Sequence, residues 1–152
     1  MLSSTEQKLV AQAIAAAEKN TSGELRVHIE KVCTQDPMQR AVAVFEQLGM
    51  QRTAERNGVL IYLALESTQL AIIGDKGINE KVPSDFWDST RDLMIKHFKE
   101  GQITTGLCAA ISEAGAQLAA YFPYQDNDQN ELSNDISFGW NYATYYSPFY
   151  LV

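Results

Sequence analysis

An unbroken apolar segment constrains the fold of this 152-residue chain more than any other feature. Residues 59–65 read Val-Leu-Ile-Tyr-Leu-Ala-Leu, without a charged side chain. Such a strand is typical of the centre of a sheet that is covered on both faces. A turn at residues 66–68 then leads to a second strand at 69–74, and so short a connection requires an antiparallel hairpin. The segment therefore predicts a sheet with helices on each side.

Another strand and four helices are predicted around this hairpin. The strand is expected at residues 24–32, where Leu25, Val27 and Ile29 alternate with polar side chains. The helices follow apolar residues that recur at helical spacing: residues 4–20, 37–48, 84–99 and 104–122. The element order α-β-α-β-β-α-α predicts an α/β fold, a three-layer αβα sandwich with a small mixed β-sheet.

Composition and charge restrict the partners. The net charge of −7 disfavours nucleic acid and anionic membrane surfaces, which need clustered Lys and Arg. No stretch approaches the roughly 18 apolar residues of a membrane span, and the first residues lack the basic and apolar regions of a signal peptide. Cys33 and Cys108 are interpreted as reduced packing thiols. We therefore expect a cytoplasmic protein.

The end of the chain has a different character. Residues 126–135 contain four carboxylates and no basic residue, and residues 138–152 contain seven aromatic residues. We expect a domain at residues 1–124, followed by an acidic linker and an aromatic C-terminal tail at 125–152. The tail can dock on the body, add a strand, mediate self-association or be poorly ordered. The sequence leaves these alternatives open.

The predicted topology gathers polar residues at one edge of the sheet. The strands at 24–32 and 58–65 are joined through a helix, so they are parallel and start at the same edge. The antiparallel strand at 69–74 ends there. Asp85 and Asp88 are expected in the first turn of the next helix. We infer a shallow cleft whose carboxylates come from all these segments: Glu24, Asp75, Asp85 and Asp88.

This carboxylate cleft would suit a hard divalent cation. Several carboxylates in one place repel one another unless a cation or a proton intervenes, and Ca²⁺ or Mg²⁺ takes carboxylate, amide and carbonyl oxygens. A structural interpretation stays open beside this one. Asp85 and Asp88 are favoured in the first turn of a helix without any ligand, and Glu24 can pair with a lysine such as Lys76.

The histidines offer little support for nucleophilic catalysis. His28 is predicted on the more polar face of its strand and His97 near the end of a helix. Neither has a Ser or Cys partner at motif spacing, so the sequence disfavours a nucleophilic triad.

Several segments resemble the signature blocks of the TPM domain family. They are Thr21-Ser22-Gly23-Glu24-Leu25-Arg26-Val27, Asn57-Gly58-Val59-Leu60-Ile61-Tyr62, Gly74-Asp75-Lys76-Gly77-Ile78, and Phe98-Lys99-Glu100-Gly101 with Gly106-Leu107. The resemblance covers about residues 2–122 and implies a small αβα sandwich. It implies that the family's motif positions fall on Gly23, Glu24, Asn57, Gly58, Gly74, Asp75 and Gly77.

The family resemblance also carries expectations about function. The family includes a plant thylakoid-lumen protein to which acid phosphatase activity and calcium binding are attributed, whereas this chain is similar to short bacterial members. Many bacterial relatives carry a signal peptide, a membrane helix and a glycine-rich tail, which this sequence does not show.

Two functions follow from the carboxylates and the resemblance. The first is a non-catalytic binding module in which Ca²⁺ or Mg²⁺ orders the loop at residues 75–83 for a protein partner. Its expected binding residues are Gly23, Asn57, Gly58, Gly74, Lys76 and Gly77. The alternative is a weak metal-assisted phosphatase that acts on phosphomonoesters. The sequence leaves open whether the protein is an enzyme.

Overall fold

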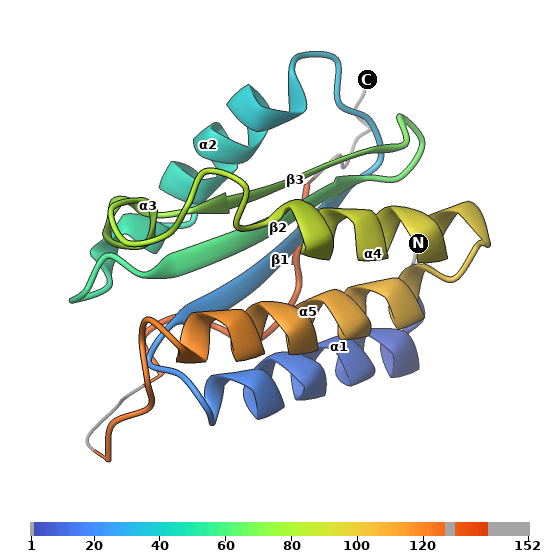
Figure 1. Cartoon of the computed structure of the whole chain (residues 1–152). Helices are drawn as coiled ribbons and strands as arrows, with labels where there is room; N and C mark the ends of the chain where they lie inside the picture. Colours follow the sequence, from blue (N-terminus) through green and yellow to red (C-terminus); the bar gives the residue numbers. More distant parts are fainter. Residues whose placement is uncertain (1, 127–129, 140–152) are drawn as a thin grey trace.

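The computed structural model describes residues 2–126 and 130–139 and confirms the α/β sandwich (Figure 1). The sheet has the strand order β3-β2-β1-β4, with β1 parallel to β2 and β4 and with β2 antiparallel to β3. Its strands are β1 (Glu24–Glu30), β2 (Gly58–Ala64), β3 (Gln69–Gly74) and β4 (Ser137–Phe138). The helices are α1 (Ser4–Glu18), α2 (Pro37–Gln47), the 3₁₀ helix η1 (Met50–Arg52), α3 (Lys76–Asn79), α4 (Asp88–Lys99) and α5 (Ile103–Ala119).

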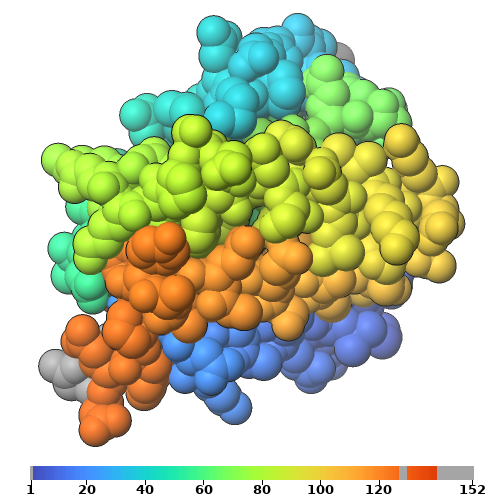
Figure 2. All heavy atoms as spheres, viewed as in Figure 1, coloured from blue at the N-terminus to red at the C-terminus, as the bar shows by residue number. Residues whose placement is uncertain are grey.

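The sheet is covered on both faces, as the apolar segment predicts. Every residue of β2 is buried. Its side chains alternate between two cores: Val59, Ile61 and Leu63 pack in the core beneath α1, α4 and α5, whereas Leu60 and Tyr62 pack beneath α2. In Figure 1, α2 lies alone on one side of the sheet, and Figure 2 shows α4, α5 and α1 side by side on the surface of the opposite layer.

The short strand β4 matches one of the alternatives left open for the C-terminal tail, the addition of a strand, but its position in the sheet was not predicted. Ser137 and Phe138 pair with His28 and Ile29 of β1 in parallel register. Ile136 and Phe138 pack against the core beneath α1 and α5, while Leu132 packs against the core beneath α2. The junction between the expected linker and the aromatic tail thus adds the fourth strand to the sheet. The remainder of the aromatic tail, from residue 140, lies outside the described residues, and the expected boundary at residue 124 stays a prediction.

The predicted start of the third long helix was wrong. Residues 84–87 form a turn, and α4 begins at Asp88. The turn is held by backbone hydrogen bonds from Phe86 N to Pro83 O and from Asp88 N to Asp85 O. Asp85 therefore precedes the helix rather than lying in its first turn.

Gly77 makes the close approach that joins α3 to the loop before β2. Its N–H donates to Arg56 O at 2.9 Å, and a Cβ at this position would lie 2.2 Å from Glu55 O and 2.6 Å from Arg56 O. Because both neighbours are backbone, they cannot rotate away as a side chain would. We expect Gly77→Ala to lower the free energy of unfolding by about 2 kcal/mol, as measured by urea denaturation. Gly101→Ala is the control. A Cβ at Gly101 would meet no atom within 4 Å, but the backbone has a φ of 75°, so a loss of stability in this variant reports backbone strain rather than a clash.

Candidate functional site

The structure brings the three sequence segments together at one edge of the sheet, as the topology predicts. Glu24 and Gly58 are paired residues of β1 and β2. Glu24 N donates to Asn57 O at 3.2 Å, and Asp75 N donates to Gly58 O at 2.9 Å. The starts of β1 and β2 and the end of β3 therefore form one continuous edge.

The buried amide of Asn57 helps to hold this edge. Asn57 Nδ2 donates to Ser22 O at 3.2 Å, and its side chain lies next to the turn that precedes β1. The residue is only 1% exposed, and no hydrogen-bond partner is recorded for its Oδ1 among the described residues. The glycines allow the same close approach: a Cβ at Gly23 would lie 3.0 Å from Leu118, and one at Gly58 would lie 3.2 Å from Met50 O.

Asp75 is bound to a residue that sequence reasoning missed. Arg56 forms a two-point ion pair with it, Nε to Oδ2 at 2.7 Å and Nη2 to Oδ1 at 2.9 Å. Asp75 also caps α3, where Lys76 N donates to Oδ1 at 2.7 Å. A cation near Asp75 would have to compete with a guanidinium that already neutralises the carboxylate. Arg56 directly precedes the motif that begins at Asn57, and nothing in the spacing pointed to the pair.

Glu24 lies in a different cavity from Asp75. It accepts hydrogen bonds from Glu131 N at 3.2 Å and Leu132 N at 3.0 Å, both from the segment that leads to β4. Its cavity, of about 230 Å³, is also lined by Glu18 and Ser22. Asp75 and Lys76 line a separate cavity of about 580 Å³ beneath α2.

Asp85 and Asp88 do not join either carboxylate. Both are exposed, and Asp88 pairs with Arg91 on the surface of α4 at 3.3 Å. They belong to the helical layer of α4, whereas Asp75 pairs on the sheet face that α2 covers. Within residues 2–126 and 130–139, no group of three His, Cys, Asp or Glu side chains is placed to hold a metal ion. The four-carboxylate cleft is therefore not formed. Glu24 and Asp75 line separate cavities, and Asp85 and Asp88 lie in the helical layer of α4.

The structure instead places Glu18 beside Glu24. Glu18 is the last residue of α1, and its Oε2 accepts a hydrogen bond from Leu25 N at 2.8 Å. Burial raises the pKa of Glu18 to about 8, and the neighbouring charge of Glu24 adds to this rise. The short turn between α1 and β1 is the feature from which Glu18 could have been predicted. It places the end of the helix, and so Glu18, next to Glu24 at the start of the strand.

The family comparison supports the resemblance. The sequence profile of the TPM domain matches residues 1–117. No curated protein matches the chain. No helix within the described residues is long and apolar enough to cross a membrane.

Solved structures are similar over most of the chain. The NMR structure of BA42 protein from the psychrophilic bacterium Bizionia argentinensis is 49% identical, covers 91% of this chain and 96% of its own, and has a TM-score of 0.87. The N-terminal domain of a protein from P. gingivalis is 18% identical with a TM-score of 0.67 and covers 83% of each chain. The N-terminal domain of cg2496 from Corynebacterium glutamicum is 14% identical with a TM-score of 0.63, and covers 82% of this chain and 79% of its own. The last two support the fold alone.

Proposed function

Because the chain belongs to the TPM-domain family, we propose that it is a binding module that takes Ca²⁺ or Mg²⁺ between Glu18 and Glu24. One observation carries the proposal: the two carboxylates line the same small cavity and are close enough for Glu24 to raise the pKa of Glu18. A divalent cation replaces the proton that otherwise keeps such a pair from repelling. Glu24 is thus retained from the predicted ligands, and Glu18 is added.

The neighbouring side chains supply the other ligands that such an ion needs. Ser22, Asn130 and Asn134 line the same cavity and carry hydroxyl or amide oxygens. Hard cations take this set together with water. An ion here would link α1, β1 and the segment that leads to β4.

Thermal unfolding with and without cation tests the proposal. A ligand at 100 times its dissociation constant stabilises the folded state by about 2.7 kcal/mol, which corresponds to roughly 5–10 °C for a chain of this size. We expect calcium or magnesium to give such a rise in wild type. The rise should disappear in Glu24→Gln and remain in Asp75→Asn, whose carboxylate lines the other cavity.

Each other outcome has a defined meaning. If neither ion raises the melting temperature of wild type, the cation site does not exist. If the rise is lost in Asp75→Asn and kept in Glu24→Gln, the ion binds beside Arg56. The phosphatase alternative stays a prediction: turnover of an aryl phosphate would have to vanish in Glu24→Gln. A protein partner and a cytoplasmic location also stay predictions.

A further inference from the structure

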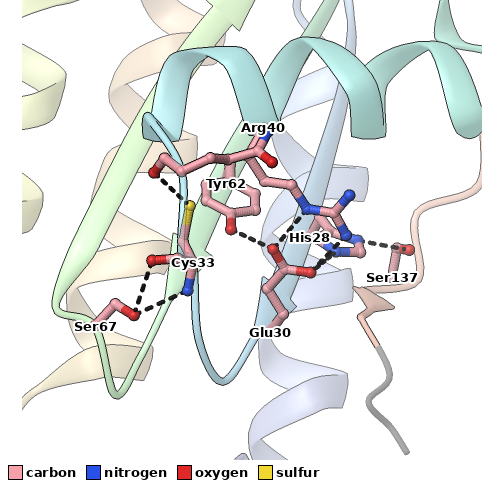
Figure 3. Close-up of polar contacts among 8 residues, drawn as sticks. His28, Glu30, Cys33, Arg40, Tyr62, Ser67 and Ser137 are labelled. Atoms are coloured by element: carbon pink, nitrogen blue, oxygen red, sulfur yellow. Dashed lines mark hydrogen bonds and ion pairs between the residues drawn. The ribbon is translucent and has the colours of Figure 1, made fainter.

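A second polar cluster lies at the opposite end of the sheet, where β1 ends. In α/β sheets, ligands commonly bind beyond the carboxyl ends of parallel strands. The parallel register pairs His28 of β1 with Ser137 of β4, so their side chains lie next to each other on the face that α2 covers. His28 Nδ1 lies 3.0 Å from Ser137 Oγ, and His28 Nε2 lies 3.4 Å from Glu30 Oε1 (Figure 3).

The state of Glu30 determines which histidine nitrogen carries the proton. Two hydrogen bonds from Arg40, both of 2.8 Å, and one from Tyr62 hold the pKa of the Glu30 carboxyl well below its usual range. An ionised carboxylate only accepts hydrogen bonds, so His28 Nε2 must be the donor. In neutral histidine the lone pair then lies on Nδ1 and faces Ser137, whose hydroxyl must donate. This is the order of hydrogen bonds in a Ser-His-acid triad.

The surroundings hold this arrangement in place. The imidazole of His28 stacks on the ring of Tyr62, with centroids 5.9 Å apart and planes 9° apart. The His28 and Glu30 side chains are 6% and 9% exposed. Gly139 leaves the space that the Glu30 carboxylate fills, because a Cβ there would lie 2.2 Å from Glu30 Oε1. A catalytic base needs such a fixed orientation.

The cluster opens into a cavity that can admit a small substrate. Its volume is about 620 Å³, and its lining includes His28, Glu30, Arg40 and Ser137. Arg40 and His28 both contact Oε1 of Glu30, so the guanidinium lies beside the imidazole and can stabilise an oxyanion there. We propose that Ser137 is the nucleophile and His28 the general base of a site that hydrolyses small carboxylic esters.

The reaction is balanced with water as co-reactant. Ser137 Oγ attacks the ester carbonyl carbon while its proton passes to His28 Nδ1. The guanidinium of Arg40 stabilises the negative charge that develops on the carbonyl oxygen. The bond to the leaving alkoxide then breaks, and His28 returns the proton to that oxygen. Water attacks the acyl group on Ser137 with His28 again as base. The carboxylic acid leaves, and Ser137 Oγ regains its proton.

A fluorophosphonate, which reacts covalently with activated serine, tests this site on the full chain. We expect one adduct per chain, located at Ser137 by peptide mass spectrometry. Labelling should be lost in Ser137→Ala and slowed at least 100-fold in His28→Gln. Ser84→Ala, which changes an exposed serine, is the control and should be labelled at the wild-type rate.

A cluster that serves only to satisfy the buried Glu30 would give a different result. Absence of labelling in folded wild type, or an adduct that persists in Ser137→Ala, overturns the proposal. An unchanged labelling rate in His28→Gln removes His28 as the base. Ser137→Ala deletes a single side-chain oxygen and removes no backbone group of the pairing between β4 and β1. We therefore expect it to fold, and its result does not depend on whether His28→Gln folds.

Discussion

Glu30→Gln is expected to lower the free energy of unfolding by about 4 kcal/mol, since breaking a buried ion pair by removing one partner typically costs this much. The carboxylate of Glu30 accepts from Arg40 Nε, Arg40 Nη2 and the hydroxyl of Tyr62. An amide offers one acceptor oxygen and turns an NH₂ group toward these donors. The donors that faced the second carboxylate oxygen would then lack an acceptor in a largely buried place. Urea denaturation at pH 7 measures the loss.

A surface ion pair provides the matched control. Lys31 and Glu66 lie 3.7 Å apart, and their side chains are 63% and 61% exposed. Glu66→Gln should change stability by less than about 0.5 kcal/mol. A comparable loss in both variants would mean that charge alone, rather than the buried contacts of Glu30, accounts for the effect.

The pH dependence of the Glu30 contribution has a definite sign. The contacts with Arg40, His28 and Tyr62 depress the pKa of Glu30 in the folded state. Its contribution is therefore complete above the usual glutamate range and is lost as pH falls below that range. The difference between wild type and Glu30→Gln should accordingly persist at neutral pH and shrink in strong acid.

The spacing of apolar residues predicted most of the fold, because that spacing reflects which faces of the strands and helices are buried. The run at residues 59–65 specified a strand covered on both faces, and the crossover through α2 then required β1 and β2 to be parallel. The short turn after β2 placed Asp75 at the same edge as Glu24. Backbone topology of this kind follows from the order of the elements and the lengths of their connections, and both can be read from a single sequence.

Side-chain partners were harder to predict because they depend on register and rotamer. Asp75 was expected beside a cation, but Arg56 reaches it from a backbone with a φ of 51°. Ser137 lies far from His28 in sequence, and only the two-residue strand β4 brings them together. A strand so short leaves almost no alternating pattern to detect, so no pattern in the chain linked the two residues.

Glu18 gives the largest expected change of stability with pH. Burial raises its pKa from 4.5 to about 8 in the folded protein. Below pH 4.5 both states hold the proton. Between 4.5 and about 8 only the unfolded chain ionises, so the free energy of unfolding falls as pH rises. Glu18→Gln has no charge to bury and keeps an oxygen for Leu25 N, and it should be more stable than wild type at pH 8.5 by about 5 kcal/mol.

Denaturation curves at pH 4.5 and 8.5 measure this difference. Glu46→Gln, which changes an exposed glutamate, is the control, and its stability should follow that of wild type at both pH values. Equal stability of wild type and Glu18→Gln at pH 8.5 would contradict the burial of an ionisable pair. Calcium separates the two claims made for this cavity. A bound ion replaces the proton on Glu18, so its stabilising effect on wild type should increase between pH 5 and 8. A pH-dependent stability that calcium leaves unchanged would confirm the buried carboxyl and reject the ion.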